Sequence, residues 1–162
     1  MMAKEDKVTG ITVSRYGGPD ISAAPSRGKW SGGLHLRAGH LSAGAMVISK
    51  NGGENNLHAH PDTDSIWICI SGKVRFYGMD DTLVAELGPV EGVAIPKGVP
   101  YWFENKEEED AVIYHITARD PAILGKEFHR VNFAPYKASQ TARGERPGRV
   151  ATEEERKVAA AL

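Results

Sequence analysis

From Gly32 to Ala118 the chain consists of short β-prone runs separated by turn residues, and this pattern limits the folds that it can adopt. The runs include AMVIS, SIWICIS, KVRFYG and AVIYHITA, and they recur roughly every 8–12 residues. Such spacing is typical of a β-sandwich or barrel. The 18 Gly and 9 Pro agree with many turns, since they make up about 17% of the chain against a usual value near 12%. We therefore predict an all-β domain.

One run, IWICI at residues 66–70, carries large apolar residues at successive positions. Continuous apolar runs are typical of strands that are covered on both faces. No Pro interrupts the run, so every backbone group can join a ladder of hydrogen bonds. We predict a central strand that is buried on both sides.

The segments outside the β-rich region differ from it in composition. Residues 1–30 mix charge, Gly, Pro and Ser without periodicity, which predicts an arm that lies over another surface. After the sequence Asp120-Pro121, which can begin a short helix, the chain turns polar and rich in Gly and Pro. Thr152 and Glu155 have the spacing of a capping box, so a short C-terminal helix should follow. We expect an arm at 1–30, a barrel at 31–136, and a polar linker with a helix at 137–162.

Net charge and cysteine content indicate which kinds of partner the protein binds and in which cellular compartment it functions. The chain has 20 Lys and Arg against 21 Asp and Glu, a net charge of −1, which predicts binding to neither nucleic acid nor membrane. The single Cys69 rules out an internal disulfide, and the N-terminus lacks the apolar run of a signal peptide, so we expect a cytoplasmic protein. A helix as short as 152–161 needs a docking surface, which favours a homodimer whose terminal segments cross the partner barrel.

The sequence His58-Ala59-His60 is the sharpest candidate for chemistry. Side chains alternate along a strand with a period of two, so both imidazoles should project from the same face. Two neutral imidazoles at this spacing can bind Fe, Mn, Ni, Cu or Zn if further ligands complete the shell. The alternative is that the pair lies on a polar surface or satisfies nearby backbone groups.

The residues around this pair resemble the first signature motif of the cupin superfamily. That motif runs Gly, five residues, His-x-His, three or four residues, Glu, six residues, Gly. The chain matches it at Gly52, His58, His60 and Gly72, with Ser65 in place of the Glu.

The second cupin motif is also recognisable: Gly, five residues, Pro-x-Gly, two residues, His, three residues, Asn. The chain keeps Pro96, Gly98 and Asn105 but has Val90 in place of the first Gly and Tyr101 in place of the His. The resemblance covers about residues 40–118. It implies a double-stranded β-helix, or jelly-roll barrel, with a pocket at its wide mouth.

In metal-binding cupins the His, His, Glu and His of the two motifs converge on one ion. The resemblance therefore implies a divalent transition metal held by His58 and His60 within an incomplete shell. The third ligand stays open among Asp64, Tyr101 and His115. Asp64 fits the shorter spacing of the motif, but a shift of one residue along a regular strand points it away from the pocket.

Three other residues complete the predicted site. Tyr101 stands where the family has a ligating His, and we expect it to act as a hydrogen-bond donor or general acid. Ser65 and Trp67 share one strand face, and we assign them to substrate binding, with core packing as the alternative for Trp67.

Two hypotheses about function follow. The first is a cupin enzyme of dioxygenase, lyase or isomerase type that acts on a small organic molecule through one metal at His58 and His60. The second is a metal-free cupin that serves as a small-molecule-binding module. A metal-independent isomerase with a His base and Tyr101 as acid belongs to this second group.

Overall fold

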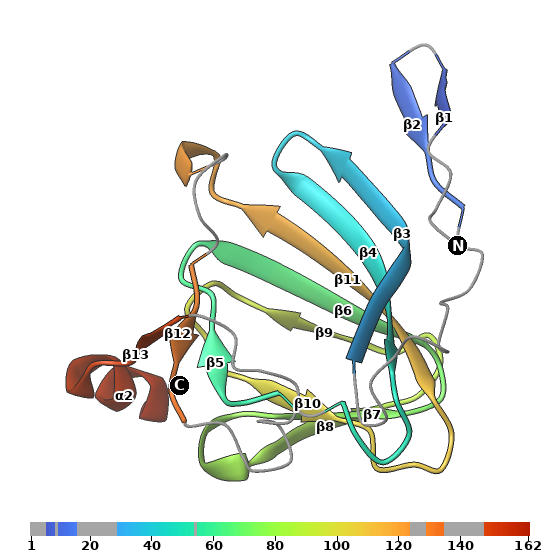
Figure 1. Cartoon of the computed structure of the whole chain (residues 1–162). Coiled ribbons are helices and arrows are strands. Elements are labelled where there is room, and N and C mark those ends of the chain that lie inside the picture. Colours follow the sequence, from blue (N-terminus) through green and yellow to red (C-terminus); the bar gives the residue numbers. More distant parts are fainter. Residues whose placement is uncertain (1–5, 9, 16–28, 54, 124–128, 135–147) are drawn as a thin grey trace.

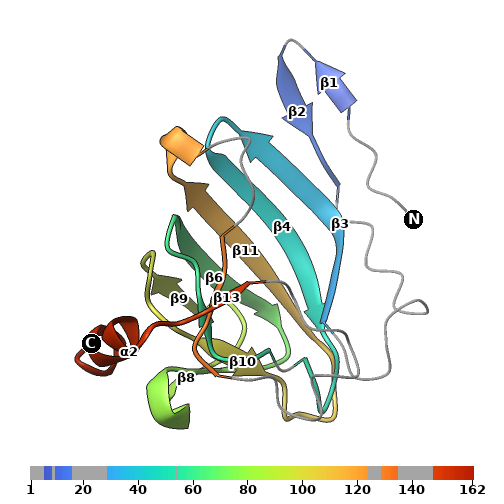
Figure 2. The same ribbon diagram turned by 60° about the vertical axis from the view of Figure 1, so that its left-hand side comes forward.

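The computed structural model describes residues 6–8, 10–15, 29–53, 55–123, 129–134 and 148–162. Within these residues the strands form two facing layers, and a short helix lies at the C-terminal end (Figure 1). The view in Figure 2 shows the larger layer as one continuous, twisted sheet. The predicted all-β domain is therefore confirmed.

The larger layer is a five-stranded antiparallel sheet whose inner strands are far apart in the sequence. Each neighbour pairs in antiparallel register, with irregularities in β3 and between β11 and β6. The order of its strands is β3 (Lys29–Ala38), β4 (Leu41–Ile48), β11 (Ala111–Arg119), β6 (Thr63–Ser71) and β9 (Gly92–Ile95).

The facing layer is built from shorter strands. One sheet has the order β10 (Trp102–Glu104), β7 (Val74–Tyr77) and β8 (Leu83–Leu87), and the 3-10 turn η2 (Met79–Asp81) connects the last two. A second sheet has the order β13 (Arg149–Val150), β12 (Val131–Asn132) and β5 (His58–Ala59). Single bridges pair Gly52 with Asn105 and His58 with Tyr101, which are the residues directly after and directly before β10. A separate hairpin of β1 (Asp6–Val8) and β2 (Ile11–Val13) lies at the N-terminal end.

The hydrophobic core fills the space between the two layers. It contains Trp67 and Cys69 from β6, Phe76 from β7, Phe103 from β10 and Ile113 from β11, each at most 2% exposed. Side chains alternate along each strand, and these residues occupy the inward positions, where apolar groups are removed from water. The core therefore holds the larger sheet against the strands that carry the two motifs.

Strand β6 corrects one prediction. It lies between β11 and β9, as expected of a central strand. Burial on both faces, however, is wrong, because Ile66 is 46% exposed and Ile70 is 39% exposed. The alternation turns Trp67 and Cys69 inward and leaves these two isoleucines on the outer face of the sheet.

The predicted C-terminal helix is confirmed as α2 (Glu153–Ala160). Thr152 accepts a hydrogen bond from the backbone N–H of Glu155, whose carboxylate accepts one from the backbone N–H of Thr152. The helix docks through Ala159 on a small cluster with Val131 and Phe133. No helix in the described part of the chain has the length and apolar character needed to cross a membrane.

The short helix expected from Asp120 begins as a 3-10 turn, η3 (Pro121–Ile123). Its continuation at residues 124–128 and the predicted linker at 137–147 lie outside the described residues.

Val90 occupies a backbone conformation that favours glycine. Its φ is 69°, in the left-handed region, and its side chain is 86% exposed. Its backbone N–H donates to the carbonyl of Cys69, which fixes the turn. This is the position where the second cupin motif has Gly. The chain keeps the same left-handed backbone conformation here, although this conformation is unfavourable for a β-branched residue such as Val90.

We expect Val90→Gly to raise the free energy of unfolding by about 1 kcal/mol, because it relieves left-handed strain at a position with no packing to lose. Val84→Gly is the matched control, since Val84 is also exposed but lies in strand β8. The control should lower stability. Urea unfolding of both variants measures the two effects, and a destabilised Val90→Gly variant would contradict the account of this turn.

Candidate functional site

The centre of the site is the cross-strand pair of His58 and Tyr101. The backbone N–H of His58 donates to the carbonyl of Tyr101 at 3.1 Å, and the N–H of Tyr101 donates to the carbonyl of His58 at 2.9 Å. Residues paired in this way project their side chains on the same face. Their ring centroids lie 4.7 Å apart.

His60 projects on the same side as His58, as the predicted alternation requires. The two imidazole centroids lie 5.0 Å apart, and the centroid of His60 lies 6.5 Å from that of Tyr101. His58 is 2% exposed and His60 is 7% exposed, so both rings are almost removed from water. Ala59 between them points the other way, into the small cluster beneath α2.

Backbone carbonyls fix the orientation of both imidazoles. The Nδ1 atom of His58 lies 2.7 Å from the carbonyl oxygen of Asn56, and that of His60 lies 3.0 Å from the carbonyl oxygen of His129. A carbonyl oxygen only accepts, so each Nδ1 must donate. In the neutral ring, Nε2 then carries the lone pair and is the hydrogen-bond acceptor.

Ser65, Trp67 and His115 form a second group on the inward face of the larger sheet. The ring of His115 stacks on Trp67 with centroids 3.6 Å apart and planes 3° from parallel. Its Nε2 atom lies 3.2 Å from the hydroxyl oxygen of Ser65. Trp67 approaches Tyr101, with ring centroids 6.3 Å apart, and contacts core residues on its other side. Of the two residues that we assigned to substrate binding, Trp67 thus lies near Tyr101 and in the core, while Ser65 contacts His115.

Trp67 carries a buried donor that lacks a hydrogen-bond partner among the described residues, its indole N–H. This N–H lies toward the phenol oxygen of Tyr101 and lowers the pKa of Tyr101, without reaching it as a regular hydrogen bond. A buried donor without a partner costs about 1–3 kcal/mol. A water molecule or a ligand atom that accepts from this N–H would remove that cost.

Burial raises the pKa of Tyr101 far above its usual value near 10, because the phenolate would lose its hydration. The positive charge of Arg130 and the indole N–H of Trp67 lower this pKa, but by less than burial raises it. Tyr101 therefore stays a phenol at neutral pH. It can donate a hydrogen bond or a proton, while the Nε2 atom of His58 can accept one.

Arg130 and its two asparagine partners belong to the site but were missed from the sequence. The Nε atom of Arg130 donates to the side-chain oxygen of Asn132 at 3.0 Å, and a terminal nitrogen donates to the side-chain oxygen of Asn56. Arg130 is 9% exposed, and its charge reaches Tyr101. From Arg130 to Phe133 polar and apolar residues alternate, which could have indicated a strand with one polar face.

The described residues around His58 and His60 do not complete the ligand shell of a transition metal. Asp64 points outward, as the alternation predicted, and its carboxylate accepts from the backbone N–H of Lys97 at 2.9 Å. Tyr101 stays protonated, and His115 stacks on Trp67 and bonds with Ser65. No cluster of three or more His, Cys, Asp or Glu in the described ranges could hold an ion. Two imidazoles alone leave an ion mostly hydrated and weakly held.

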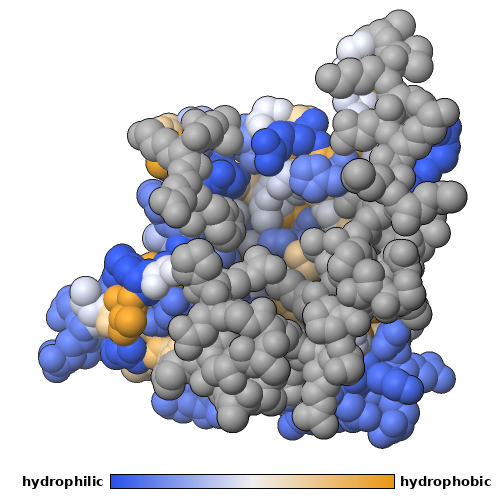
Figure 3. Space-filling view, viewed as in Figure 1, coloured by the Kyte–Doolittle hydropathy of each residue, from blue (hydrophilic) through white to orange (hydrophobic). Residues whose placement is uncertain are grey.

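Figure 3 shows the face of Figure 1 as a surface that is hollowed in its upper centre. Both hydrophilic and hydrophobic residues are visible above the hollow and inside it. This mixture differs from the apolar core beneath and agrees with a recess that holds polar side chains.

We expect the phenol of Tyr101 to remain protonated where an ordinary tyrosine, with a pKa near 10, is half ionised. The difference in tyrosinate absorbance between the wild type and Tyr101→Phe, followed against pH, measures this directly. Because the pKa is higher in the folded state, this group stabilises the fold fully below about pH 10, and its contribution falls as the pH rises further. A tyrosinate signal lost with Tyr101 below pH 10 would contradict the assignment.

Comparison with known proteins shows similarity to cupin domains. Residues 45–117 match the model of the cupin domain. The cupin domain of Cnp3 from Schizosaccharomyces pombe has 14% identity and a TM-score of 0.54 over 75% of this chain and 90% of that chain. A protein with a double-stranded β-helix domain from Klebsiella pneumoniae has 18% identity and a TM-score of 0.50 over 64% and 84%.

A protein with a cupin-2 domain from Shewanella frigidimarina has 26% identity and a TM-score of 0.45 over 52% of this chain and 76% of that chain. A search of curated proteins found no match. The first two structural similarities show the fold, and the predicted double-stranded β-helix is confirmed. The matched residues 45–117 include His58, His60 and Tyr101, so this part of the chain is similar to a cupin domain.

Proposed function

We propose that this cupin binds a small hydroxycarboxylate, or a close relative of one, in the barrel mouth between His58, His60 and Tyr101, without a resident metal ion. The observation that carries the proposal is the set of buried hydrogen-bonding groups at this place. Acceptors and donors of fixed orientation lie side by side there, and one donor, the N–H of Trp67, has no partner among the described residues. Binding sites use few polar groups placed in this way to orient a ligand.

The donors favour a ligand with carboxylate or carbonyl oxygens. Tyr101 keeps its proton because burial raises its pKa, and the indole N–H of Trp67 lies close by. The charge of Arg130 also reaches this position. Hydrogen bonds to a charged acceptor are about twice as strong as those between neutral groups, so an anionic oxygen gains most here.

The acceptors favour a hydroxyl group on the same ligand. The Nε2 atoms of neutral His58 and His60 carry lone pairs, because their Nδ1 atoms donate to backbone carbonyls. A ligand hydroxyl can donate to one of these atoms. The deoxy analogue cannot make this hydrogen bond, so it should bind less tightly.

The same groups supply an acid and a base for proton transfer. Tyr101 can protonate a carbonyl oxygen, while the Nε2 atom of His58 takes a proton from the neighbouring hydroxyl-bearing carbon, which gives an enediol. His58 then returns the proton to the former carbonyl carbon, and the Tyr101 phenolate takes a proton from the other hydroxyl group, so an isomer forms with no net change in oxidation state. This metal-independent isomerisation is the reaction that we propose for the site if it is catalytic. The short separation of the two rings, 4.7 Å between centroids, places acid and base on the same side of a ligand.

A metal-dependent enzyme is the second candidate, because the backbone carbonyls orient His58 and His60 as they orient metal ligands in other proteins. A divalent transition metal would be held by these two imidazoles. The donor set described above lacks the carboxylate and the further imidazole that would complete the shell, so we place this candidate second.

We predict that a calorimetric titration with a panel of two- to six-carbon hydroxycarboxylates finds at least one that binds more tightly than its deoxy counterpart. Tyr101→Phe should weaken that binding by roughly 10- to 100-fold, since one hydrogen bond to a charged group is lost. Tyr77→Phe is the matched control, because the Tyr77 hydroxyl donates to Glu104 and not to the site. The proposal fails if no panel member binds, or if both variants bind as the wild type does.

Metal uptake separates the two candidates. We expect protein purified without chelator, and then titrated with Zn²⁺ or Fe²⁺, to bind less than about a tenth of an equivalent at micromolar concentration. The double variant Ser65→Glu/Tyr101→His, which restores the two missing ligand types, should bind more tightly than the wild type. Stoichiometric uptake by the wild type that is lost in His58→Ala would support the metal-dependent enzyme instead.

A further inference from the structure

We infer that an apolar cavity beside Tyr101 holds the hydrocarbon tail of the ligand, so that the preferred ligand is a hydroxycarboxylate with an alkyl chain of several carbons. The inference rests on the proposed function, which places the polar head of this ligand between His58, His60 and Tyr101. Its starting point is a cavity of about 530 Å³ on the side of the barrel. Tyr101 lines this cavity and also belongs to the site, so the two spaces meet at one side chain.

The cavity lies between the two layers, at one edge of each. Strand β9 is an edge strand of the five-stranded sheet, and β8 is an edge strand of the sheet that faces it. Val93 and Ile95 of β9 line the cavity from one layer, and Phe76 of β7 lines it from the other. These three side chains also pack in the core, so the inner end of the cavity reaches the interior of the barrel.

The register of the sheet brings the apolar cavity directly beside the polar site. Trp67 of β6 pairs with Val93 of β9, and Ser65 pairs with Ile95. Directly paired residues project on the same face, so each apolar residue of the cavity lies next to a residue that we assigned to substrate binding. Tyr101 contacts both groups, because its ring approaches Trp67 and it also lines the cavity. A ligand with its polar head at Tyr101 can therefore extend an alkyl chain along β9.

The C-terminal end of α2 forms the outer wall of the cavity. Ala159, Ala160 and Leu162 line it there, and Val84 of β8 lines it from the barrel. Figure 2 shows α2 beside η2, the turn that connects β7 and β8. The two alanine side chains are small and leave room between the helix and the strands. Leu162 is 82% exposed and Val84 is 64% exposed, so the cavity is open to solvent at this end.

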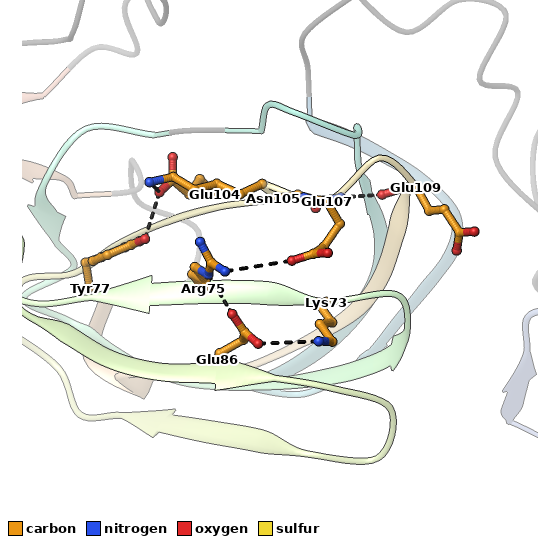
Figure 4. A network of polar contacts seen from close by, with 9 residues as sticks. Lys73, Arg75, Tyr77, Glu86, Glu104, Asn105, Glu107 and Glu109 are labelled. Atoms are coloured by element: carbon orange, nitrogen blue, oxygen red, sulfur yellow. Dashed lines mark hydrogen bonds and ion pairs between the residues drawn. The ribbon is translucent and has the colours of Figure 1, made fainter.

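The lining of the cavity favours a hydrocarbon group. Among the described residues that line it, the charged one is Asp80, which is exposed, as is the hydroxyl-bearing Thr82. Tyr77 also lines the cavity, but its hydroxyl donates to Glu104 at 2.8 Å. Figure 4 shows this hydroxyl turned toward Glu104, within the charged network around Arg75. A polar ligand group inside the cavity would lose its hydration without gaining a partner, whereas an alkyl chain would not.

The volume of the cavity suits a chain of several carbons. Pockets that bind small molecules measure about 300–1,000 Å³, and this cavity lies within that range. Each CH₂ group that leaves water for an apolar environment strengthens binding by about fourfold. The affinity for a ligand should therefore rise with the length of its chain until the cavity is filled.

The test is a calorimetric titration of the full chain with straight-chain 2-hydroxy acids, from lactate to 2-hydroxydecanoate. We expect the dissociation constant to fall by about fourfold for each added CH₂ group over several members, with an increasingly negative change in heat capacity. Ala160→Trp should weaken binding of 2-hydroxyoctanoate by at least about thirtyfold, because the indole occupies the cavity, and should change lactate binding by less than about twofold. Ala161→Trp is the matched control, since its neighbouring position does not line the cavity.

Val84→Trp fills the cavity from β8 and guards against a defect of the helix in the first variant, while circular dichroism monitors the fold of each. Equal affinity of the wild type for all chain lengths would overturn the inference and leave the proposed function standing. Long-chain acids that bind equally well to Tyr101→Phe but poorly to Ala160→Trp would support the hydrocarbon site and overturn the proposed function.

Two further outcomes are decisive. If no acid of any length binds, both proposals fail. If Ala160→Trp and Val84→Trp change the sedimentation of the protein but not its dependence on chain length, a second copy of the chain occupies the cavity and the inference fails.

Discussion

The paired backbone hydrogen bonds between His58 and Tyr101 are the contact on which the site depends. They join two segments that are far apart in the sequence, and they place an imidazole and a phenol 4.7 Å apart inside the barrel. The position of His60 follows from the alternation of side chains along the strand. Strand β12 pairs with β5, with Asn132 opposite His58. Because rigid backbone pairing sets these positions, the polar groups are oriented before any ligand arrives.

The two layers differ in the polarity of the side chains on their inner and outer surfaces. Toward one end of the barrel the inward positions are apolar and form the core, with Phe76 and Phe103. Toward the mouth they are polar, as the hydrogen bond of 2.6 Å between Ser42 and Thr117 illustrates. The outer faces contrast in the same way, charged around Arg75 and apolar around Ile66.

Much of this could be predicted from the sequence, because spacing determines local geometry. The alternation of side chains along a strand correctly predicted that Asp64 points outward and that His58 and His60 project on the same side. The two motifs together predicted the barrel and the proximity of His58 and Tyr101. No local pattern in the sequence could predict that proximity. Arg130 could not be found in this way, since it reaches the site through pairing between strands distant in the sequence. The exposure of Ile66 was missed because a continuous apolar run does not show which of its side chains the rest of the chain leaves uncovered.

The central claim is that His58 and His60 are neutral acceptors, oriented by backbone carbonyls, in a site without a resident metal. Nitrogen NMR of the imidazole rings, with His58→Gln and His60→Gln for assignment, tests it most directly. The account predicts a protonated Nδ1 and an unprotonated Nε2 on both rings at neutral pH, with shifts unchanged by a chelator. A proton on Nε2, a doubly protonated ring, or a metal-bound shift that the chelator removes would contradict it.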